Sequence, residues 1–492
     1  MFVPSGGDLQ KAINDALPGD TISLQGRFTG EYNLPPKDGL VKIVSENVLP
    51  DRRITPNDEN LLPIIGSGSV MPVFTGQDAR NWLIDGVKLL PTINGENNLI
   101  ALQDAENVTF DRILFVADDN VGQRRALLGN GINISLKRSH FARCWSRDGD
   151  SQAFCAWDGA GPYGVIDNYL EAGSENIMLG GADSLSASRI PNNITIEHNT
   201  ITKPLDWQGK ARGVKNLLEL KCAKNVKVRY NDFSNCWADA QNGYGIVFTT
   251  RNQDGHAPWS IIENVLFEFN KVVNCQRGVN TLGIDDSQPS GRGNNLIIRN
   301  NIFQTSDWFY VINGEWLDMV VEQNTIFNQN PWASACVATG DRVWPAGLPA
   351  PRAMQFAVEN LTWKNNLLYM NDYGFFGDAG KPWLDYIKGK LDFTNNALAN
   401  RQSGQTMPGT NWYPTKAEHE ANFNGFELKS NSPYQTMATD GGPLGARFVV
   451  EPPVPPVDII TYDEYLSYFC HTCGSFVKDK NIHTAWHLKG GK

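Results

Sequence analysis

The sequence predicts an all-β fold, a solenoid in which short strands stack in parallel around a single core. The first observation is an eight-residue pattern that recurs along the chain, with apolar residues at positions one and three and Asn at position six. The second is its spacing, because successive Asn residues are 23 to 42 residues apart, as in solenoids whose loops vary while their strands keep register. The third is the near absence of helical periodicity.

Each copy of the pattern predicts one strand followed by a bend. Alternating apolar residues form a strand with one buried face, and Asn tolerates the left-handed backbone of a bend. Where bends stack, each side-chain amide can donate to the next, which gives an amide ladder along parallel strands. Two earlier copies keep the apolar positions but have Ile113 and Ser139 in place of the Asn. The expected ladder is Asn168, Asn199, Asn231, Asn270, Asn301, Asn324, Asn366 and Asn396.

An antiparallel sandwich or a propeller also contains many short strands, and it is the alternative to the solenoid. Those folds need tight hairpins between neighbouring strands, whereas most connections here exceed twenty residues. With a rise of about 4.8 Å per coil, the pattern predicts roughly a dozen coils.

The predicted solenoid is closed at both ends. Residues 6–13 begin a short helix with Asp8 as its N-cap, and a turn then leads into the first strand. Such a helix covers a strand edge that would otherwise recruit other chains. The stretches 6–13 and 18–24 resemble the opening of right-handed parallel β-helix proteins of the pectate-lyase-like superfamily, and residues 432–446 resemble its closing segment. This resemblance implies a single-stranded right-handed parallel β-helix over residues 1–446, with an N-terminal capping helix.

The bulk properties disfavour some partners. The formal net charge is −10 and the isoelectric point is near 5.3, which argues against binding to nucleic acid. No apolar stretch reaches the length of a membrane span, so no membrane insertion is expected. Residues 1–4 lead directly into the fold without a recognisable signal peptide, so we expect synthesis and initial retention in a cytoplasm. The six cysteines before residue 447 lack a framework spacing and are interpreted as reduced packing residues.

The composition changes after residue 446. Residues 447–457 form a Pro-rich linker, and residues 458–492 carry Cys and His with the spacing C-x2-C-x9-H-x3-H. Four such ligands form a closed tetrahedral zinc site, and metal binding supplies the folding free energy that so short a segment lacks. The alternatives are a redox CxxC motif or a tail with incidental histidines, while the short spacer and the absence of Arg disfavour a nucleic-acid reader. The predicted structural zinc ligands are Cys470, Cys473, His483 and His487.

The C-terminal tail has a resemblance of its own. Residues 473–477, Cys-Gly-Ser-Phe-Val, ahead of residues 483–487, His-Thr-Ala-Trp-His, resemble the ends of minor tail proteins of phages that infect actinobacteria. This resemblance implies a virion structural protein, either a minor tail or tail-spike-like component or a capsid decoration, which is made in a host cytoplasm and works outside the cell. Its implied partners are other tail or capsid proteins and a host surface polysaccharide. The homotrimer common among β-helix spikes is the implied assembly.

A dense set of charged and tryptophan residues lies between residues 175 and 259. Lys215, Glu219 and Lys221 share strand parity, so all three can face one side of the solenoid. Tryptophan rings stack on pyranose faces and charged groups bind hydroxyls, which favours a glycan-binding face, whereas the alternative is a salt-bridged outer surface. The candidate glycan-binding residues are Asp183, Lys203, Trp207, Lys215, Glu219, Lys221, Arg251, Asp254, Asp285 and Asp286.

Whether this face is catalytic stays open in the sequence, and no catalytic residue is assigned. Polysaccharide lyases need a base, usually Arg or Lys, and carboxylates that hold Ca²⁺, whereas glycoside hydrolases need two carboxylates that flank the bond. Asp285 and Asp286 are the best carboxylate pair, but adjacent residues could both serve only on a bend, and a turn with solvated acids is the favoured interpretation. We therefore favour a virion protein that binds glycans without catalysis. One alternative is a lyase or hydrolase of acidic polysaccharide, either secreted or virion-borne, with calcium expected only for a lyase. The other is a cell-surface structural protein.

Overall fold

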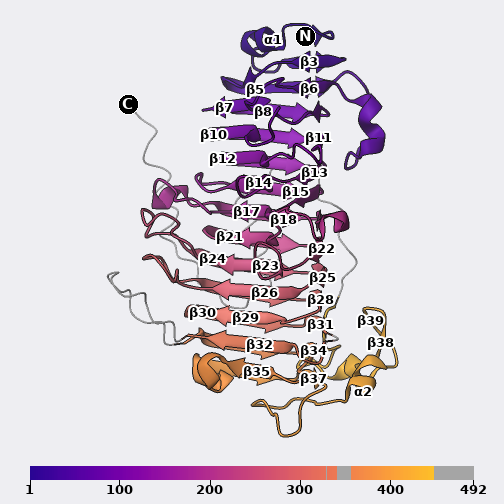
Figure 1. Ribbon diagram of the computed structural model, residues 1–492, viewed down its shortest axis with the longest axis vertical. Helices are drawn as coiled ribbons and strands as arrows, with labels where there is room; N and C mark the ends of the chain where they lie inside the picture. The colour runs from indigo at the N-terminus through magenta and orange to yellow at the C-terminus, as the bar shows by residue number, and fades with distance from the viewer. Residues whose placement is uncertain (329, 341–355, 448–492) are drawn as a thin grey trace. The chain divides into compact units, whose positions relative to one another are not determined.

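The computed structural model describes residues 1–328, 330–340 and 356–447. These residues belong to one compact unit, Met1–Glu451, which is a solenoid of parallel strands (Figure 1). The parallel β-helix predicted from the sequence is therefore confirmed. The second unit, Pro452–Lys492, lies outside the described residues, and with it the four predicted zinc ligands. No helix among the described residues is long and apolar enough to span a membrane.

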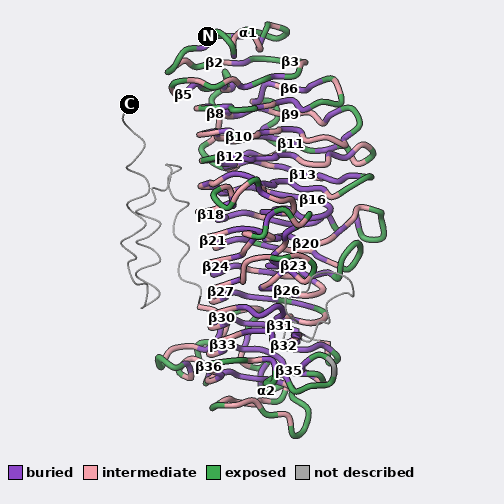
Figure 2. Tube along the Cα trace, turned by 90° about the vertical axis from the view of Figure 1, so that its left-hand side faces the viewer, coloured by how far each residue is buried: buried purple, intermediate pink, exposed green. Residues whose placement is uncertain are grey.

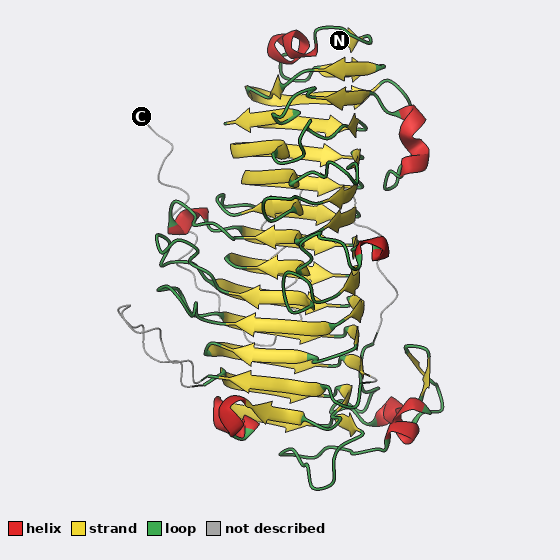
Figure 3. Ribbon diagram, in the orientation of Figure 1, coloured by secondary structure: helices red, strands yellow, loops and turns green. Residues whose placement is uncertain are grey.

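Each coil contributes strands to three rows, named here in the order in which the chain visits them (Figure 3). Row one precedes the Asn bend and comprises β1 (Phe2–Val3), β2 (Thr21–Leu24), β5 (Pro36–Ser45), β8 (Arg80–Asp85), β15 (Tyr163–Ile166), β18 (Asn192–Glu197), β21 (Ala223–Arg229), β24 (Ile262–Glu268), β27 (Asn294–Arg299), β30 (Trp316–Glu322), β33 (Val358–Lys364) and β36 (Ile387–Thr394). Row two follows the bend and is a separate 13-stranded sheet of β3 (Arg27–Thr29), β6 (Ile64–Gly66), β9 (Lys88–Leu89), β11 (Leu114–Val116), β13 (His140–Cys144), β16 (Tyr169–Ala172), β19 (Thr200–Thr202), β22 (Asp232–Cys236), β25 (Lys271–Cys275), β28 (Ile302–Thr305), β31 (Thr325–Asn328), β34 (Leu367–Tyr369) and β37 (Ala397–Ala399). Row three comprises β4 (Tyr32–Asn33), β7 (Phe74–Gln77), β14 (Gln152–Ala156), β17 (Glu175–Leu179), β20 (Asn216–Leu220), β23 (Tyr244–Thr249), β26 (Arg277–Leu282), β29 (Tyr310–Asn313), β32 (Ser334–Thr339) and β35 (Gly374–Gly377).

Two long strands join rows three and one. β10 (Asn98–Asp111) pairs with β7 near its start and with β8 near its end, and β12 (Arg125–Lys137) pairs with β14 and then with β15. Because both strands run through the corner without a break, rows three and one form a single 24-stranded sheet. Every pairing in these rows is parallel, which stacks equivalent residues of successive coils above one another.

The predicted amide ladder is present. From Asn168 to Asn396, each Asn Nδ2 donates to the Oδ1 of the next ladder Asn over 2.9–3.2 Å. The backbone N–H of each ladder Asn donates to the same oxygen, and a further Nδ2 bond reaches a carbonyl of the preceding coil. The ladder continues beyond its predicted ends, to Ser139 at one side and Asn411 at the other.

The physical reason expected for the Asn was only half right. The residue with left-handed backbone angles is the one before each ladder Asn, with φ between +53° and +58°. The ladder Asn itself points inward and is at most 2 % exposed, so it is required for its amide and not for its backbone freedom. The left-handed residues on three successive coils are His198, Tyr230 and Phe269, whose rings stack outside the bend with centroids 5.4 and 5.2 Å apart.

The core runs the length of the β-helix. Figure 2 shows buried residues along the strands and exposed ones gathered in the loops that project from the coils. Trp82, Trp316 and Trp363 are among the largest fully buried side chains. Burial of each large apolar side chain stabilises the fold by about 1.5–3 kcal/mol. The six described cysteines are buried and free, which confirms that they are packing residues.

Both ends of the coil are covered. α1 (Leu9–Asp15) closes the N-terminal end, and the Asp8 carboxylate caps it by accepting the Lys11 N–H (2.9 Å), as predicted. At the other end, an apolar cluster that includes Tyr434 and Leu444 packs on the last coils. The remaining elements are α2 (Lys416–Glu420), β38 (Phe423–Asn424), β39 (Glu427–Leu428) and the 3-10 helices η1 (Pro56–Leu61), η2 (Ala187–Arg189), η3 (Leu205–Trp207), η4 (Asp378–Gly380), η5 (Trp383–Tyr386) and η6 (Pro433–Thr436).

Candidate functional site

Four polar side chains stand at the start of four consecutive row-three strands. Arg125, Gln152, Glu175 and Asn216 occupy paired positions on β12, β14, β17 and β20. Arg125 Nε donates to Gln152 Oε1 (2.6 Å), and Gln152 Nε2 donates to Glu175 Oε2 (2.7 Å). Each of them is followed along its strand by core residues, so the four side chains lie at the edge of the core. We call the four residues the polar column.

Five charged residues gather beside the polar column, and we call them the charged cluster: Asp150, Glu175, Lys215, Glu219 and Lys221. Lys215 Nζ lies between two carboxylates, 2.5 Å from Asp150 Oδ2 and 3.4 Å from Glu175 Oε1. Lys221 Nζ is 3.7 Å from Glu219 Oε1. The cluster therefore places two ammonium groups against three carboxylates on adjacent coils of row three.

Burial controls the electrostatics of this cluster. Glu175 is fully buried and Glu219 is 3 % exposed, whereas the side chains of Lys215 and Lys221 are 16 % and 15 % exposed. Burial, and then repulsion by Glu219, raises the pKa of Glu175 to about 7 even though both lysines oppose the shift. Burial alone would lower the pKa of Lys215, but attraction by Glu175 and Asp150 outweighs it and the net direction is upward. The Asp150 side chain, 43 % exposed, is the most accessible member of the cluster, and both lysines are partly exposed.

Lys221 and Arg251 lie on neighbouring coils, since Arg251 N donates to Lys221 O (2.9 Å). The loop after β17 packs its backbone against Lys221, because a Cβ on Gly180 would lie 2.9 Å from Lys221 Cβ. Gly180 and Gly181 both have φ of +90°, a conformation that a side chain would strain. Two glycines in succession therefore allow this loop to pack closely against Lys221, where a side chain would clash.

Two acids of the next coil anchor the Arg251 guanidinium. Arg251 Nη1 is 3.0 Å from Asp285 Oδ1 and also pairs with Asp286. Asp285 is 1 % exposed and accepts the backbone N–H groups of Asn252 (2.7 Å) and Ser287 (2.8 Å). The sequence-based interpretation of solvated acids is thus wrong for Asp285, which organises a buried turn. The Arg251 side chain keeps 29 % of its surface exposed.

Asp183 joins two loops that border the cluster. Its Oδ2 accepts the backbone N–H groups of Asp254 (3.2 Å) and His256 (2.8 Å) from the loop after β23. Trp259 Nε1 donates to Ser184 Oγ (3.0 Å) and makes a second connection between the same loops. Asp183 therefore acts through the backbone of its neighbour loop, while the Asp254 side chain is exposed.

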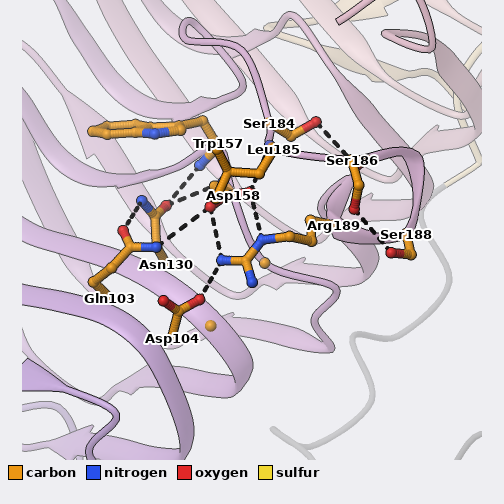
Figure 4. A network of polar contacts seen from close by, with 12 residues as sticks. Gln103, Asp104, Asn130, Trp157, Asp158, Ser184, Leu185, Ser186, Ser188 and Arg189 are labelled. Carbon is orange, nitrogen blue, oxygen red and sulfur yellow. Dashed lines mark hydrogen bonds and ion pairs between the residues drawn. The ribbon is translucent and has the colours of Figure 1, made fainter.

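A second polar network holds the later part of the loop after β17 (Figure 4). Arg189 on η2 donates from Nε and Nη2 to the Asp158 carboxylate (both 2.7 Å) and also pairs with Asp104. Asp158 accepts the Leu185 N–H (3.0 Å), and Asn130 Oδ1 accepts the Asp158 N–H (3.2 Å). This bidentate pair, with Asp158 buried, fixes the loop that carries Gly180 to Asp183 over the cluster.

The structure brings most of the predicted residues together. Six of them lie within or next to the charged cluster: Lys215, Glu219, Lys221, Arg251, Asp285 and Asp286. Asp183 and Asp254 connect the two loops beside it. Sequence reasoning missed Asp150, Arg125 and Gln152, which become neighbours of Glu175 only once strand register is known. The available signal was a polar residue at the start of each apolar strand.

Lys203 and Trp207 do not belong to this surface, so their assignment to a glycan-binding face is wrong. Both are 0 % exposed. Lys203 Nζ donates to the carbonyl oxygens of residues 172–174 (2.8–3.0 Å) and to Asn176 Oδ1 (2.9 Å). Trp207 packs under the Arg143 guanidinium at 5.5 Å. Lys203 is thus bound to backbone of the preceding coil and Trp207 is covered within its loop, so neither side chain offers a surface to a ligand.

The charged cluster does not fit a calcium ion. The described residues contain no group of three or more His, Cys, Asp or Glu side chains that could hold a metal. Beside the buried carboxylates of Glu175 and Glu219, the positive charge comes from Lys215 and Lys221. We therefore assign no step to a calcium ion at this cluster, and the predicted zinc site lies outside the described residues.

No protein-family model and no curated protein sequence matches the chain. Among solved structures, the chain is similar to a PL6-family polysaccharide lyase from Pseudopedobacter saltans, with 12% sequence identity over 92% of this chain and 97% of the other, at a TM-score of 0.50. It is also similar to the PL6-family alginate lyase AlyGC, with 13% identity over 92% of this chain and 59% of that one, at a TM-score of 0.51.

The alginate lyase is thus considerably longer than the part that this chain matches. At such low identity the likeness concerns the fold. The structure is a parallel β-helix whose structural neighbours include polysaccharide lyases.

Proposed function

We propose that this protein binds an acidic polysaccharide over the charged cluster and cleaves it by β-elimination. The observation that carries the proposal is the placement of Lys221 and Arg251 on neighbouring coils, with Lys215 at the other end of β20. Arg125 adds a fourth cation, and within the described residues it forms no ion pair. Three of these four cations are paired with acids, namely Asp150, Glu175, Glu219, Asp285 and Asp286, so the site offers positioned cations and not a net positive charge.

β-Elimination requires three events at a uronate residue. A base removes the C5 proton, the C4–O4 bond breaks, and the electron pair from the C5–H bond becomes the C4=C5 double bond while O4 takes a proton. We assign Lys221 as the base: its ammonium first gives a proton to solvent, the free amine then accepts the C5 proton, and the ammonium so formed donates a proton to O4. Arg251 neutralises the uronate carboxylate, which stabilises the negative charge that develops next to C5.

The buried acids have a supporting role in this proposal. Glu175 and Glu219 have almost no exposed surface, so they are positioning residues that hold Lys215 and Lys221 and do not contact the sugar. The two structural neighbours are named as a polysaccharide lyase and an alginate lyase, which supports polysaccharide as the substrate class and alginate as the first substrate to test.

The test is a cleavage assay on a panel of acidic polysaccharides that includes alginate and polygalacturonate. The new C4=C5 double bond absorbs in the ultraviolet, so turnover is followed directly. We expect wild type to cleave at least one member, and Lys221→Ala to lower the rate by about a hundredfold or more. Lys224→Ala is the matched control, because Lys224 also lies on a coil surface in an ion pair, with Glu263 (3.7 Å), but outside the cluster.

The outcomes separate the alternatives. A substrate that Lys221→Ala cleaves as fast as wild type does would refute the assigned base. Binding without cleavage by wild type would leave the protein as a glycan-binding β-helix, the function favoured from the sequence.

The virion setting stays a prediction from the C-terminal sequence, together with the zinc ligands, the tail or capsid partners and the homotrimer. A virion protein with a polysaccharide-cleaving β-helix would expose the host surface, so the two proposals are compatible. Elemental analysis is the direct check on the C-terminal module, with about one zinc per chain expected.

A further inference from the structure

A set of aromatic rings and one guanidinium continues from the charged cluster toward the C-terminal coils. Arg277 lies between two rings, with its Cζ 5.4 Å from the Tyr244 centroid and 4.6 Å from the Trp308 centroid. Trp308 contacts Phe376 at 6.0 Å, and Phe376 contacts Tyr373 at 6.0 Å. We call these five residues the aromatic platform.

The platform is in register with the polar column. Asn216, Tyr244 and Arg277 follow one another as the first residues of β20, β23 and β26, and Tyr244 pairs with Arg277. Trp308 continues this position in the loop two residues before β29, because Val279 pairs with Tyr310. These strands stack in succession down row three (Figure 1). From Arg125 to Trp308 the register position advances through six coil steps, which is about 29 Å at the spacing of parallel strands. One extended ligand parallel to the β-helix axis could therefore contact both sets.

The platform is incompletely buried. Tyr373 is 53 % exposed, while Trp308 and Phe376 are half-buried. Trp332 lies on the intervening loop and is 66 % exposed, the largest exposed aromatic surface in the described residues. Pro331 O accepts the Asp372 N–H (2.8 Å), which stacks this loop against the one that carries Tyr373. The core has no need of these rings, and exposed rings of this size usually indicate a contact surface.

We infer that the aromatic platform is a second glycan-binding subsite, which holds the polysaccharide chain beyond the residues that the charged cluster contacts. Flat rings offer faces on which pyranose rings stack. Arg277 Nε pairs with Asp307 Oδ2 (2.8 Å), and its other N–H groups can donate to a sugar hydroxyl or carboxylate. The rise of one coil is close to the length of one sugar in an extended polymer, so successive sugars meet successive coils. The ligand class rests on the proposed function, whereas the location of the subsite rests on the register and the contacts.

The test measures binding and not turnover. Isothermal titration calorimetry uses alginate oligosaccharides of increasing length, in a Lys221→Ala background that prevents cleavage. Trp308→Ala and Tyr373→Ala should weaken the binding of long oligosaccharides about tenfold and leave that of disaccharides unchanged. Phe2→Ala is the matched control, since Phe2 is an equally exposed aromatic (55 %) at the capped end, and it should change nothing.

Three results would overturn the inference. They are equal weakening at every length, no weakening in either variant, and no binding of any uronate oligosaccharide by the parent. The Tyr373→Ala variant protects the test against a folding defect of Trp308→Ala, because Tyr373 lies largely outside the core. If light scattering showed that Trp308→Ala dissociates an oligomer without affecting glycan binding, the platform would be a protein interface instead. Absence of cleavage by wild type would refute the proposed lyase activity but not this subsite.

Discussion

At the residue scale, the site depends on charges that are kept out of water. Removing Glu175 from solvent is costly, and the nearby ammonium of Lys215 offsets only part of that cost, as the raised pKa of Glu175 shows. Lys215 Nζ lies within 3.4 Å of the Asp150 and Glu175 carboxylates, while 16 % of its side chain stays exposed. Lys215 also pairs with Asp150 (2.5 Å), so loss of Glu175 leaves its ammonium with a partner, whereas loss of Lys215 removes a paired cation from the buried Glu175.

The raised pKa of Glu175 predicts a specific dependence of stability on pH. Folded Glu175 binds its proton up to about pH 7, whereas the ordinary value is 4.5. The unfolded chain releases this proton earlier, so the free energy of unfolding of the wild type falls as pH rises from 4.5 to about 7. Glu175→Gln removes this contribution, and we expect the stability of the variant relative to wild type to increase across that window and then level off.

Urea denaturation at a series of pH values, followed by tryptophan fluorescence, measures this difference. Glu59→Gln controls for the loss of a carboxylate, because Glu59 is an exposed partner of Lys88. A stability difference that stays flat between pH 4.5 and 7 would contradict the buried, protonated state of Glu175.

At the element scale, the bends decide the architecture. The ladder Asn could be predicted because its amide is needed at one fixed offset from an apolar strand, so it survives every change of loop length. A second set of amides was missed, at the bend between rows three and one, where Asn264 Nδ2 donates to Asn225 Oδ1 and Asn295 Nδ2 to Asn264 Oδ1 (both 2.9 Å). Those residues carry the left-handed angles themselves and stand directly before copies of the eight-residue pattern, so the repeat contained this signal and only its sixth position was used.

The same argument explains how much of the site was predictable. Strand parity placed Lys215, Glu219 and Lys221 together, since it depends only on neighbours along one strand. The contacts of Glu175 with Gln152 and Lys215 depend on coils of different length, 23 residues in one step and 41 in the next, which no local pattern encodes. The burial of Lys203 was equally hidden, because a charged residue in a turn is ordinarily exposed.

Removal of one ladder rung should be costly. Asn231 Nδ2 donates to Asn270 Oδ1 (3.0 Å) and Ile196 O (2.9 Å), and its Oδ1 accepts from Asn199. Asn231→Ala leaves buried backbone and amide groups without partners, so we expect a loss of about 2–3 kcal/mol in the free energy of unfolding. Asn274→Ala, which removes an exposed amide contact with Asn235, should cost far less. Equal losses in the two variants, by chemical denaturation, would show that the ladder has no special role.

The closing segment should respond to acid. Burial lowers the pKa of His419 to about 4, and its Nδ1 lies 3.1 Å from Tyr434 Oη under the segment. The unfolded chain gains this proton near the ordinary value of 6.5 and the folded chain does not, so stability is lost as pH falls from 6.5 toward 4. Hydrogen exchange in residues 416–446 should therefore accelerate over this range, and His419→Phe should remove most of the acceleration. Unchanged exchange in the wild type would contradict this role of His419.

At the scale of the whole described unit, the β-helix is a rigid support that stacks equivalent strand residues of successive coils above one another. Along row three these positions carry polar groups, then the charged cluster beside them, then aromatic rings, while the opposite side of each strand maintains the core. The fold class was predictable because it repeats. The use of one face was not, because it depends on which loops bring Asp150, Arg251 and Trp308 to neighbouring coils.

The most direct measurement is a crystal structure of Lys221→Ala with a bound alginate oligosaccharide. The account predicts a sugar chain along row three, with a uronate carboxylate in contact with Arg251 and the following sugars directed toward Trp308. A sugar chain bound to another face, or no bound sugar under saturating conditions, would contradict it.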